Sequence, residues 1–428
     1  MDFKGTKYKL QNITDGRVFE DKGWMLSDPL SASPSLIRAI YDNKKFTPRN
    51  DLSGLYRFAE WMPVKRVLKG SDAPLTYRSE KLADYLGLNN LYITFSGYWP
   101  QKGANMQTCS FKETEAYSVC GRMDKDFEKI LIVASAGNTA RAFAKVCSEN
   151  NIPLLLCVPY DNLSALWFDK PLNDCVKLIA TPAGSDYFDA INLSNIIAQS
   201  DMFIEEGGAK NVARRDGMAT TVLSAVEHIG RIPDSYFQAV GSGTGTIAAW
   251  EANLRLIEDG RFGNHMMRLC PSQNSPYTLI YDSWQAKSRE LVALSEEQSR
   301  QNASIIEAKV LSNRKPPYSI AGGLYDALVN TNGKMWLASN NDIAHASRLF
   351  MELEGVDIHP AAAVAVSSLI QAAREKTLSK DDIVMLNITG GGEELFKFTN
   401  KITYLKPHKV ISTNQKHEII VREAEDLF

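Results

Sequence analysis

A single lysine, Lys112, stands where the sequence predicts the start of a helix. Ser110 and Glu113 have the Ser-x-x-Glu spacing of a capping box, and Glu115 and Ala116 favour continuation of the helix. The first turn of a helix carries partial positive charge, so we expect the pKa of Lys112 to be lowered. A neutral amine can attack a carbonyl or form a Schiff base, which makes Lys112 a candidate nucleophile. A solvated surface lysine is the alternative.

The stretch SAGNTA, residues 135–140, follows a predicted strand and begins a predicted helix. Backbone N–H groups converge at such a turn, and the helix start favours an anion, so a small carboxylate would fit there. The predicted substrate-binding residues are Ser135, Ala136, Gly137, Asn138 and Thr139. An ordinary turn in which Asn138 or Thr139 caps the helix is the alternative.

A second glycine-rich turn, GSGTGT at residues 241–246, lies between an apolar run and the predicted helix IAAWEANLRL. Backbone N–H groups and threonine hydroxyls in such a turn can surround a phosphate. The predicted phosphate-binding residues are Gly241, Ser242, Gly243, Thr244, Gly245 and Thr246.

The same turn satisfies the G-x-G-x-x-G/A dinucleotide fingerprint through Gly243, Gly245 and Ala248. That fingerprint expects an acidic residue at the end of the next strand, whereas the run HMMRLCPSQ ends around Pro271 and Ser272. A nicotinamide-dependent oxidoreductase is therefore a minor alternative, and so is a purely structural glycine turn.

The stretch NITGGGEE places Thr389 at the end of an apolar run and before three glycines. A hydroxyl there can hydrogen-bond a heteroaromatic nitrogen without forcing its protonation, which a carboxylate would do. A threonine that simply ends a strand is the alternative. Together, an aldehyde-reactive amine, a carboxylate turn, a phosphate turn and an uncharged strand end describe a site for pyridoxal phosphate.

The motifs SFK, SAGNTA, GSGTGT and ITGGG, in this order, resemble those of fold-type II pyridoxal phosphate enzymes, and threonine synthase is the most similar of these. The stretches APLTYRSEKLADYLGLNNLYI and IHPAAAVAVSSL extend the resemblance over the chain from about Ala73 to Phe396. The resemblance implies an α/β fold like that of the tryptophan synthase β subunit, with two domains of mainly parallel twisted sheets flanked by helices. It also suggests a homo-oligomer.

Two departures from threonine synthase concern the substrate. Threonine synthases usually lead into the lysine with Asn-Pro-Thr-Gly-Ser-Phe-Lys-Asp-Arg, whereas this chain has GANMQTCSFKETEA, and Gly391 stands where they often have a histidine. This combination resembles the cysteate synthase family of coenzyme M-making archaea, which replaces the phosphate of O-phospho-L-serine with sulfite. Threonine synthase activity on O-phosphohomoserine and water, and a non-catalytic relative, are the alternatives.

The resemblance also implies a role for each motif. Lys112 would hold pyridoxal 5'-phosphate and remove the Cα proton, Asn138 would bond the 3-oxygen of the cofactor, and Thr389 its ring nitrogen. Residues 135–139 would hold the substrate carboxylate, and residues 241–246 the cofactor phosphate. Because the departing phosphate and the incoming sulfite are both anions, a basic subsite is expected near the lysine. The candidates by neighbourhood are Lys102, Arg141, Arg214 and Arg215.

Composition narrows the class of partner. Over 428 residues, 48 basic and 50 acidic side chains nearly cancel, which argues against a nucleic-acid surface or a polybasic membrane anchor. No run of about 18 apolar residues occurs, the six cysteines form no Cys-x-x-Cys pair, and the six histidines are scattered. We therefore expect a cytoplasmic enzyme of small molecules that binds no metal.

The order of predicted elements indicates nested domains. Residues 130–133, 138–150 and 153–158 read as a strand, a helix and a strand, which is one βαβ unit. We expect a larger domain from residues 1–112 and 209–428 and a smaller one from residues 113–208. Residues 293–319 read as a surface excursion between helices, Pro360 as a first helical residue, and the tail from Lys406 as a terminal strand or arm.

Overall fold

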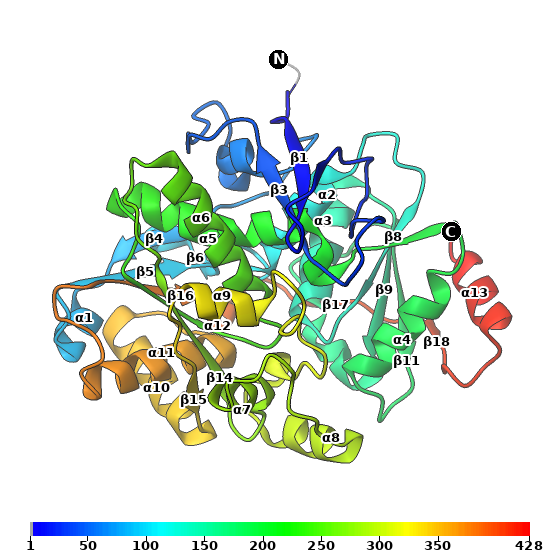
Figure 1. Ribbon diagram of the computed structural model, residues 1–428. Coiled ribbons are helices and arrows are strands. Elements are labelled where there is room, and N and C mark those ends of the chain that lie inside the picture. Colours follow the sequence, from blue (N-terminus) through cyan, green and yellow to red (C-terminus); the bar gives the residue numbers. More distant parts are fainter. Residues whose placement is uncertain (1–2) are drawn as a thin grey trace.

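The computed structural model describes residues 3–428, and its core consists of two mainly parallel β-sheets flanked by helices (Figure 1). One sheet has five parallel strands in the order β12-β8-β9-β11-β18. These are β8 (Ile130–Ala134), β9 (Leu154–Pro159), β11 (Val176–Thr181), β12 (Phe203–Glu205) and β18 (Lys409–Val410). Helix α3 (Asn138–Asn150) joins β8 to β9, so the predicted βαβ unit is confirmed.

The other sheet has six strands in the order β15-β14-β13-β16-β5-β4, of which only β4 runs antiparallel to its neighbour. These are β4 (Leu75–Arg78), β5 (Asn90–Phe95), β13 (Ser235–Ala239), β14 (Arg268–Asn274), β15 (Trp336–Ala338) and β16 (Ile383–Ile388). Strands β13 and β16 pair in parallel, so their carboxyl ends lie at one edge of the sheet. The turns at 241–246 and 389–391 follow these two ends.

Helices flank both sheets, and most of them bury apolar side chains against a sheet or a neighbouring helix, whereas α8 buries only Ser299. They are α1 (Lys81–Leu86), α2 (Lys112–Arg122), α4 (Tyr187–Ile197), α5 (Val212–Ile229), α6 (Thr244–Asp259), α7 (Leu279–Gln285), α8 (Glu296–Ile305), α9 (Leu324–Asn330), α10 (Asn340–Glu354), α11 (Pro360–Arg374), α12 (Glu393–Thr399) and α13 (His417–Glu425). Pro360 is the first residue of α11, as predicted, and the alanine-rich face of this helix is buried against the six-stranded sheet.

Helices α2 and α5 pack closely against each other. A Cβ atom at Gly217 of α5 would come within 2.3 Å of the backbone oxygen of Thr114 on α2. Only glycine therefore allows α5 to pass this close to the helix that begins with Lys112.

Short strands complete the fold. They are β1 (Tyr8–Asn12), β2 (Val18–Phe19), β3 (Ile37–Tyr41), β6 (Tyr98–Trp99), β7 (Ala104–Asn105), β10 (Trp167–Phe168) and β17 (Thr403–Tyr404).

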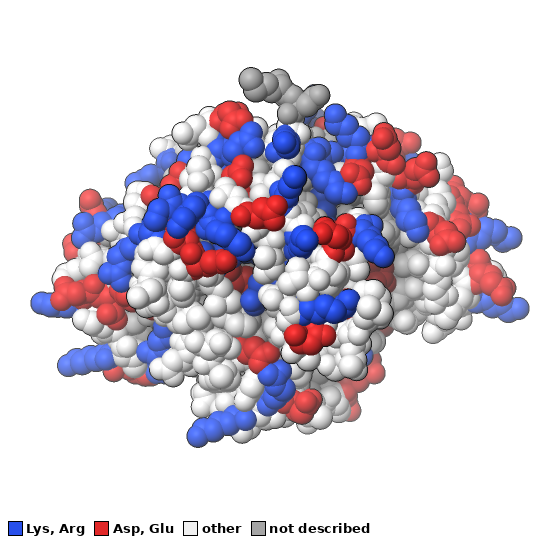
Figure 2. All heavy atoms as spheres, turned by 45° about the horizontal axis from the view of Figure 1, so that its top comes forward, with Lys and Arg blue, Asp and Glu red and all other residues white. Residues whose placement is uncertain are grey.

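The face in Figure 2 carries acidic and basic side chains side by side, in keeping with a formal net charge of −2. Among the helices of residues 3–428, none is long and apolar enough to cross a membrane.

The end of the chain returns to the five-stranded sheet. Strand β18 pairs with β11, β17 pairs with β10, and α13 packs against α4 through Ile420 and Ala424 (Figure 1). The tail is thus both a strand, as expected, and a helix. The division of the chain at residues 112 and 208 remains a prediction, and it had grouped these C-terminal elements with the six-stranded sheet.

Candidate active site

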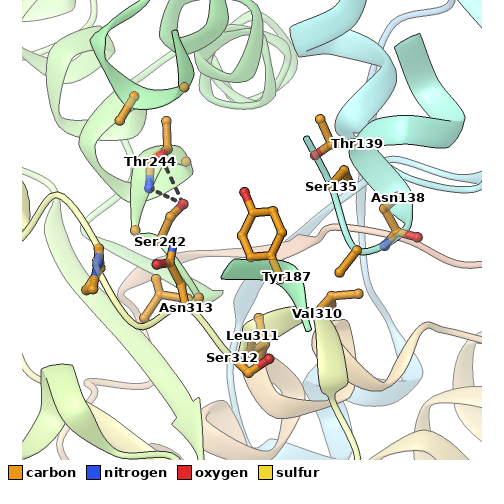
Figure 3. A pocket seen from close by; sticks show the side chains of 18 of the residues that line it. Ser135, Asn138, Thr139, Tyr187, Ser242, Thr244, Val310, Leu311, Ser312 and Asn313 are labelled. Atoms are coloured by element: carbon orange, nitrogen blue, oxygen red, sulfur yellow. Dashed lines mark hydrogen bonds between the residues drawn. The ribbon is translucent and has the colours of Figure 1, made fainter. Parts of the chain in front are cut away.

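The predicted motifs open into one cavity of about 660 Å³ (Figure 3). Its walls come from the carboxyl ends of both sheets, since Ser135 follows β8 and Thr389 follows β16. Every predicted site residue except Thr246 lines it. The predicted residues in the lining are Lys112, Ser135, Ala136, Gly137, Asn138, Thr139, Gly241, Ser242, Gly243, Thr244, Gly245 and Thr389.

Backbone pairing places the lysine beside the end of β16. The N–H of Phe111 donates to the carbonyl oxygen of Thr389 at 3.0 Å, and the N–H of Gly391 donates to that of Cys109 at 3.1 Å. Between them Ser110 and Gly390 form an antiparallel bridge. This pairing of residues 109–111 with residues 389–391 holds Lys112, the first residue of α2, close to Thr389, the residue predicted to bond the ring nitrogen of the cofactor.

The start of α2 differs from the predicted capping box. The Ser110 hydroxyl accepts from the N–H of Lys112 at 3.3 Å, and it does not cap the N–H of Glu113. The carboxylate of Glu113 folds back instead to accept from the N–H of Thr108 at 2.6 Å. The capping box prediction is therefore wrong. Ser110 is held by the pairing with the end of β16, and Glu113 bonds to Thr108 in the segment before the helix.

Burial governs the pKa of Lys112. Desolvation lowers this pKa, and the nearby Arg214 guanidinium lowers it further, whereas Glu115 raises it. The ammonium Nζ lies 3.1 Å from a carboxylate oxygen of the fully buried Glu115. The predicted direction of the shift is therefore correct, but its leading cause is loss of hydration.

Arg141 supports the predicted carboxylate-binding turn at residues 135–139 from outside the cavity. This buried guanidinium donates to the amide oxygen of Asn138 at 3.0 Å and to the carbonyl oxygens of Thr108 and Ala165 at 2.9 and 2.8 Å, and it lies 4.0 Å from the ring centre of Trp167. Arg141 thus orients the side chain predicted to bond the cofactor's 3-oxygen and does not line the cavity.

Two other predicted cations lie outside the cavity. Lys102 lies over the rings of Tyr77 and Trp99. Arg215 is buried and pairs with Glu251 at 2.9 Å. Of the four basic residues proposed from sequence neighbourhood, only Arg214 lines the cavity, because chain proximity does not set the direction of a side chain.

The glycine turn fits a phosphate group. A Cβ at Gly241 would lie 2.9 Å from the Cα of Leu311, and one at Gly245 would lie 2.6 Å from the amide of Gln238, so glycine leaves the backbone open to the cavity. The hydroxyls of Ser242 and Thr244 lie 2.9 Å apart (Figure 3). The buried hydroxyl of Thr246 has no partner within residues 3–428. The turn also begins α6, whose N-terminus favours an anion.

The excursion between β14 and β15 forms a wall of the cavity. Residues 309–317, within the segment predicted as a surface excursion, line it, and Leu311 lies against Gly241 of the glycine turn. Val310, Leu311, Ser312 and Asn313 lie below Tyr187 in Figure 3. Arg314 pairs with Asp186, the residue that caps α4. Sequence analysis missed this wall because a polar, proline-ended segment is typical of a loop, although its basic run NRK was a signal.

Charge in the cavity is strongly positive. Six cationic side chains line it against one carboxylate, that of Asp186, among residues 3–428, although Lys112 and Arg214 also pair with Glu115 and Glu206 behind the lining. The six are Lys112, Lys210, Arg214, Lys309, Arg314 and Lys315. Such an arrangement favours anionic ligands. In the same residues no group of three or more metal-ligating side chains is found.

Comparisons with known proteins agree with this geometry. A family model described as "Pyridoxal-phosphate dependent enzyme" matches residues 85–390. Cysteate synthase of Methanosarcina acetivorans is 45% identical over 88% of this chain and 91% of that protein. Cysteate synthase of Methanosarcina barkeri is 44% identical over 98% and 99%. Maize serine racemase superposes with a TM-score of 0.57 at 12% identity, over 76% of this chain and 92% of that one.

These findings define the class, which is that of the pyridoxal-phosphate-dependent enzymes with two mainly parallel sheets, and the predicted fold is confirmed. Within this class the chain belongs to the cysteate synthase family. The residues present fit the cofactor, since an amine, an uncharged hydroxyl and a glycine turn open to the backbone share one cavity. The threonine synthase and dinucleotide alternatives are not favoured.

The pairing between residues 109–111 and 389–391 predicts the effect of Gly390→Ala. The new Cβ would lie 2.7 Å from the Cys109 carbonyl oxygen, so the two segments must separate, and we expect a loss of about 1–3 kcal/mol in the free energy of unfolding together with slower capture of pyridoxal phosphate. Gly103→Ala is the control, because its Cβ meets open space but its left-handed backbone strains alanine, by about 1–2 kcal/mol, so it should lose stability without slower capture of the cofactor. If Gly390→Ala captures the cofactor as fast as Gly103→Ala, the pairing does not position Lys112.

A second prediction concerns pH. His359 accepts from the N–H of Ala361 and caps α11, and burial lowers the pKa of His359 to about 4 from 6.5. Between these values the unfolded chain binds more protons, so folding stability falls as pH drops from about 6.5 to 4, by up to roughly 3 kcal/mol from this group.

His359→Asn keeps a capping side chain and removes the titration. We expect urea unfolding of this variant to lose less stability between pH 7 and pH 4.5 than unfolding of the wild type. The same change at the exposed His417 is the control. Equal losses in all three proteins would show that His359 does not contribute to acid sensitivity.

Proposed function

We propose that this protein catalyses a β-replacement that converts O-phospho-L-serine and sulfite to L-cysteate and phosphate, a step toward coenzyme M. The observation that carries the proposal is the cavity itself, in which Lys112 and the two anion-binding turns lie with five further cations and one carboxylate of residues 3–428. Both substrates and the released phosphate are anions, and so is the cofactor. Membership of the cysteate synthase family supports the choice of reaction.

Each motif would make one contact with the cofactor or the substrate. Lys112 would hold pyridoxal phosphate through its amine, residues 241–246 its phosphate, Asn138 its 3-oxygen and Thr389 its ring nitrogen. When bound, this cofactor supplies an electron sink next to the substrate Cα. A neutral hydroxyl at the ring nitrogen does not force protonation of that nitrogen, which favours expulsion of a leaving group.

Lys112 would move the proton in both halves of the reaction. Its lowered pKa makes the neutral amine accessible, so it can take the Cα proton of phosphoserine. The Cβ–O bond then breaks and phosphate leaves with the bond electrons. Sulfite forms the new Cβ–S bond with its own electron pair, and the ammonium of Lys112 returns the proton to Cα. No oxidant or reductant is required.

The wall at residues 309–317 supplies the cations for the exchanged anions. Arg314 is already paired with Asp186, and Arg214 is paired with Glu115 and Glu206. Lys315 lies 4.9 Å from the ring centre of Phe188 and has no carboxylate partner within residues 3–428. A phosphate or sulfite in this part of the cavity would therefore meet a charge that the protein leaves unbalanced.

The first test replaces the amine. Lys112→Ala should lower sulfite-dependent phosphate release by about 1,000-fold or more, because both covalent attachment and proton transfer are lost. Borohydride treatment of the wild-type holoenzyme should leave a cofactor adduct on the peptide that contains Lys112. The control is Lys102→Ala, which lies outside the cavity and should retain full activity. Full activity of Lys112→Ala, or an adduct on another lysine, would refute the assignment.

The second test concerns the shared anion pocket. Phosphate and sulfite should each inhibit competitively with respect to the other, and Lys315→Ala should raise the KM for both substrates by about 3- to 10-fold at low ionic strength. Lys334→Ala is the control, since Lys334 also lies over an aromatic ring, 3.7 Å from the ring centre of Trp336, but pairs with Glu375 and lies outside the cavity. Independent inhibition would contradict a shared pocket. Faster turnover of O-phosphohomoserine with water would contradict the substrate assignment.

A further inference from the structure

Lys112 belongs to a buried ion quartet that the reaction scheme above does not use in full. Glu115, three residues on along α2, accepts from Lys112 Nζ at 3.1 Å. The same carboxylate accepts two hydrogen bonds from Arg214 on α5, at 3.1 Å from Nε and 3.0 Å from Nη2. The other arm of Arg214 reaches Glu206, after β12, at 2.5 Å.

The quartet is largely buried in the wall of the cavity. The side chain of Glu115 is fully buried, those of Arg214 and Glu206 are 14% and 6% exposed, and that of Lys112 is 19% exposed. Tyr187 on α4 adds a neutral hydroxyl-bearing ring near Arg214, and the ring centre of Phe111 lies 4.8 Å from the ammonium. Glu115, Arg214 and Glu206 are the charged groups that act on the pKa of Lys112.

The charges balance only when the lysine is charged. Two carboxylates face one guanidinium and one ammonium, so loss of the Lys112 proton leaves one negative charge in excess in a site with little water. An unbalanced buried charge is energetically costly. The two carboxylates therefore raise the pKa of Lys112 and oppose desolvation, which lowers it. Arg214 competes with Lys112 for Glu115, because its guanidinium donates two hydrogen bonds to the same carboxylate.

We propose that Glu115 is a positioning residue that holds the ammonium form of Lys112 in place whenever the amine is not joined to the cofactor, and that Arg214 sets the strength of this hold. The ammonium that has taken the Cα proton is then kept next to the reaction centre until it returns that proton. This last consequence rests on the proposed function, whereas the contact itself does not.

The test uses the full-length chain freed of cofactor and measures the rate at which it captures pyridoxal phosphate, by visible absorbance, as a function of pH. Only a neutral amine attacks the aldehyde, so the rate constant rises with pH and levels off near the pKa of Lys112. Glu115→Gln should move this break to lower pH, by about 1 to 3 units, because the opposite charge is removed. Arg214→Gln should move it to higher pH, because a like charge is removed.

Opposite shifts are the signature of the proposal, and a merely structural role does not produce them. Glu113→Gln is the matched control, because Glu113 is a buried glutamate one residue from Lys112 that contacts Thr108 and Lys145. The control should leave the break unchanged. A break that stays in place in Glu115→Gln, or that moves in the same direction in both variants, overturns the proposal. Where Glu115→Gln does not fold, Arg214→Gln decides alone, an upward shift supporting the proposal and any other result refuting it.

This readout needs neither phosphoserine nor sulfite. Failure of the wild type to capture the cofactor at any pH would refute the cofactor assignment of Lys112. Normal capture without the predicted shifts would refute only the role of Glu115. The two failures are therefore distinct.

Discussion

The active site depends on one short stretch of backbone pairing, between residues 109–111 and residues 389–391. Segments almost 280 residues apart in the chain meet there, and two backbone hydrogen bonds set the position of the first residue of α2 against the end of β16. The pairing needs Gly390, since a side chain there would strike the Cys109 carbonyl. Backbone contacts of this kind position an amine more rigidly than its own four-carbon side chain can, because that chain has many rotamers.

Once the lysine is placed, desolvation and charge balance act on it in opposite directions. Loss of hydration lowers the pKa of Lys112 and so favours the neutral, nucleophilic amine. The buried Glu115 raises this pKa and so favours the protonated ammonium. A helix dipole acts in the same direction as desolvation but is a smaller effect, typically below about 1 kcal/mol at an exposed helix end. Three charged groups therefore set the pKa of Lys112: Glu115 on its own helix, Arg214 on α5 and Glu206 after β12.

Much of the fold and most of the site could be predicted from the sequence, because local patterns carry them. The βαβ unit at 130–158 follows from apolar runs and helical periodicity, and the turns at 135–139 and 241–245 follow from strand, glycine and helix order. Partners that only tertiary contacts create were not predictable. The wall at 309–317 reads as a loop, the Ser110 cap is taken over by pairing with β16, and Arg141 turns inward to hold Asn138.

The wall also connects the two sheets, and the strength of this connection bears on access to the cavity. Asp186 caps α4 through the N–H groups of Phe188 and Asp189 and at the same time pairs with Arg314 and Arg300 from the excursion. Its side chain is 30% exposed, so these pairs are hydrated, and such ion pairs contribute at most about 1 kcal/mol each. The wall is thus aligned with α4 and its Tyr187 without being locked to it. An anion that approached Arg314 would compete with Asp186 for the same guanidinium, so anion binding there would weaken the contact between the wall and α4.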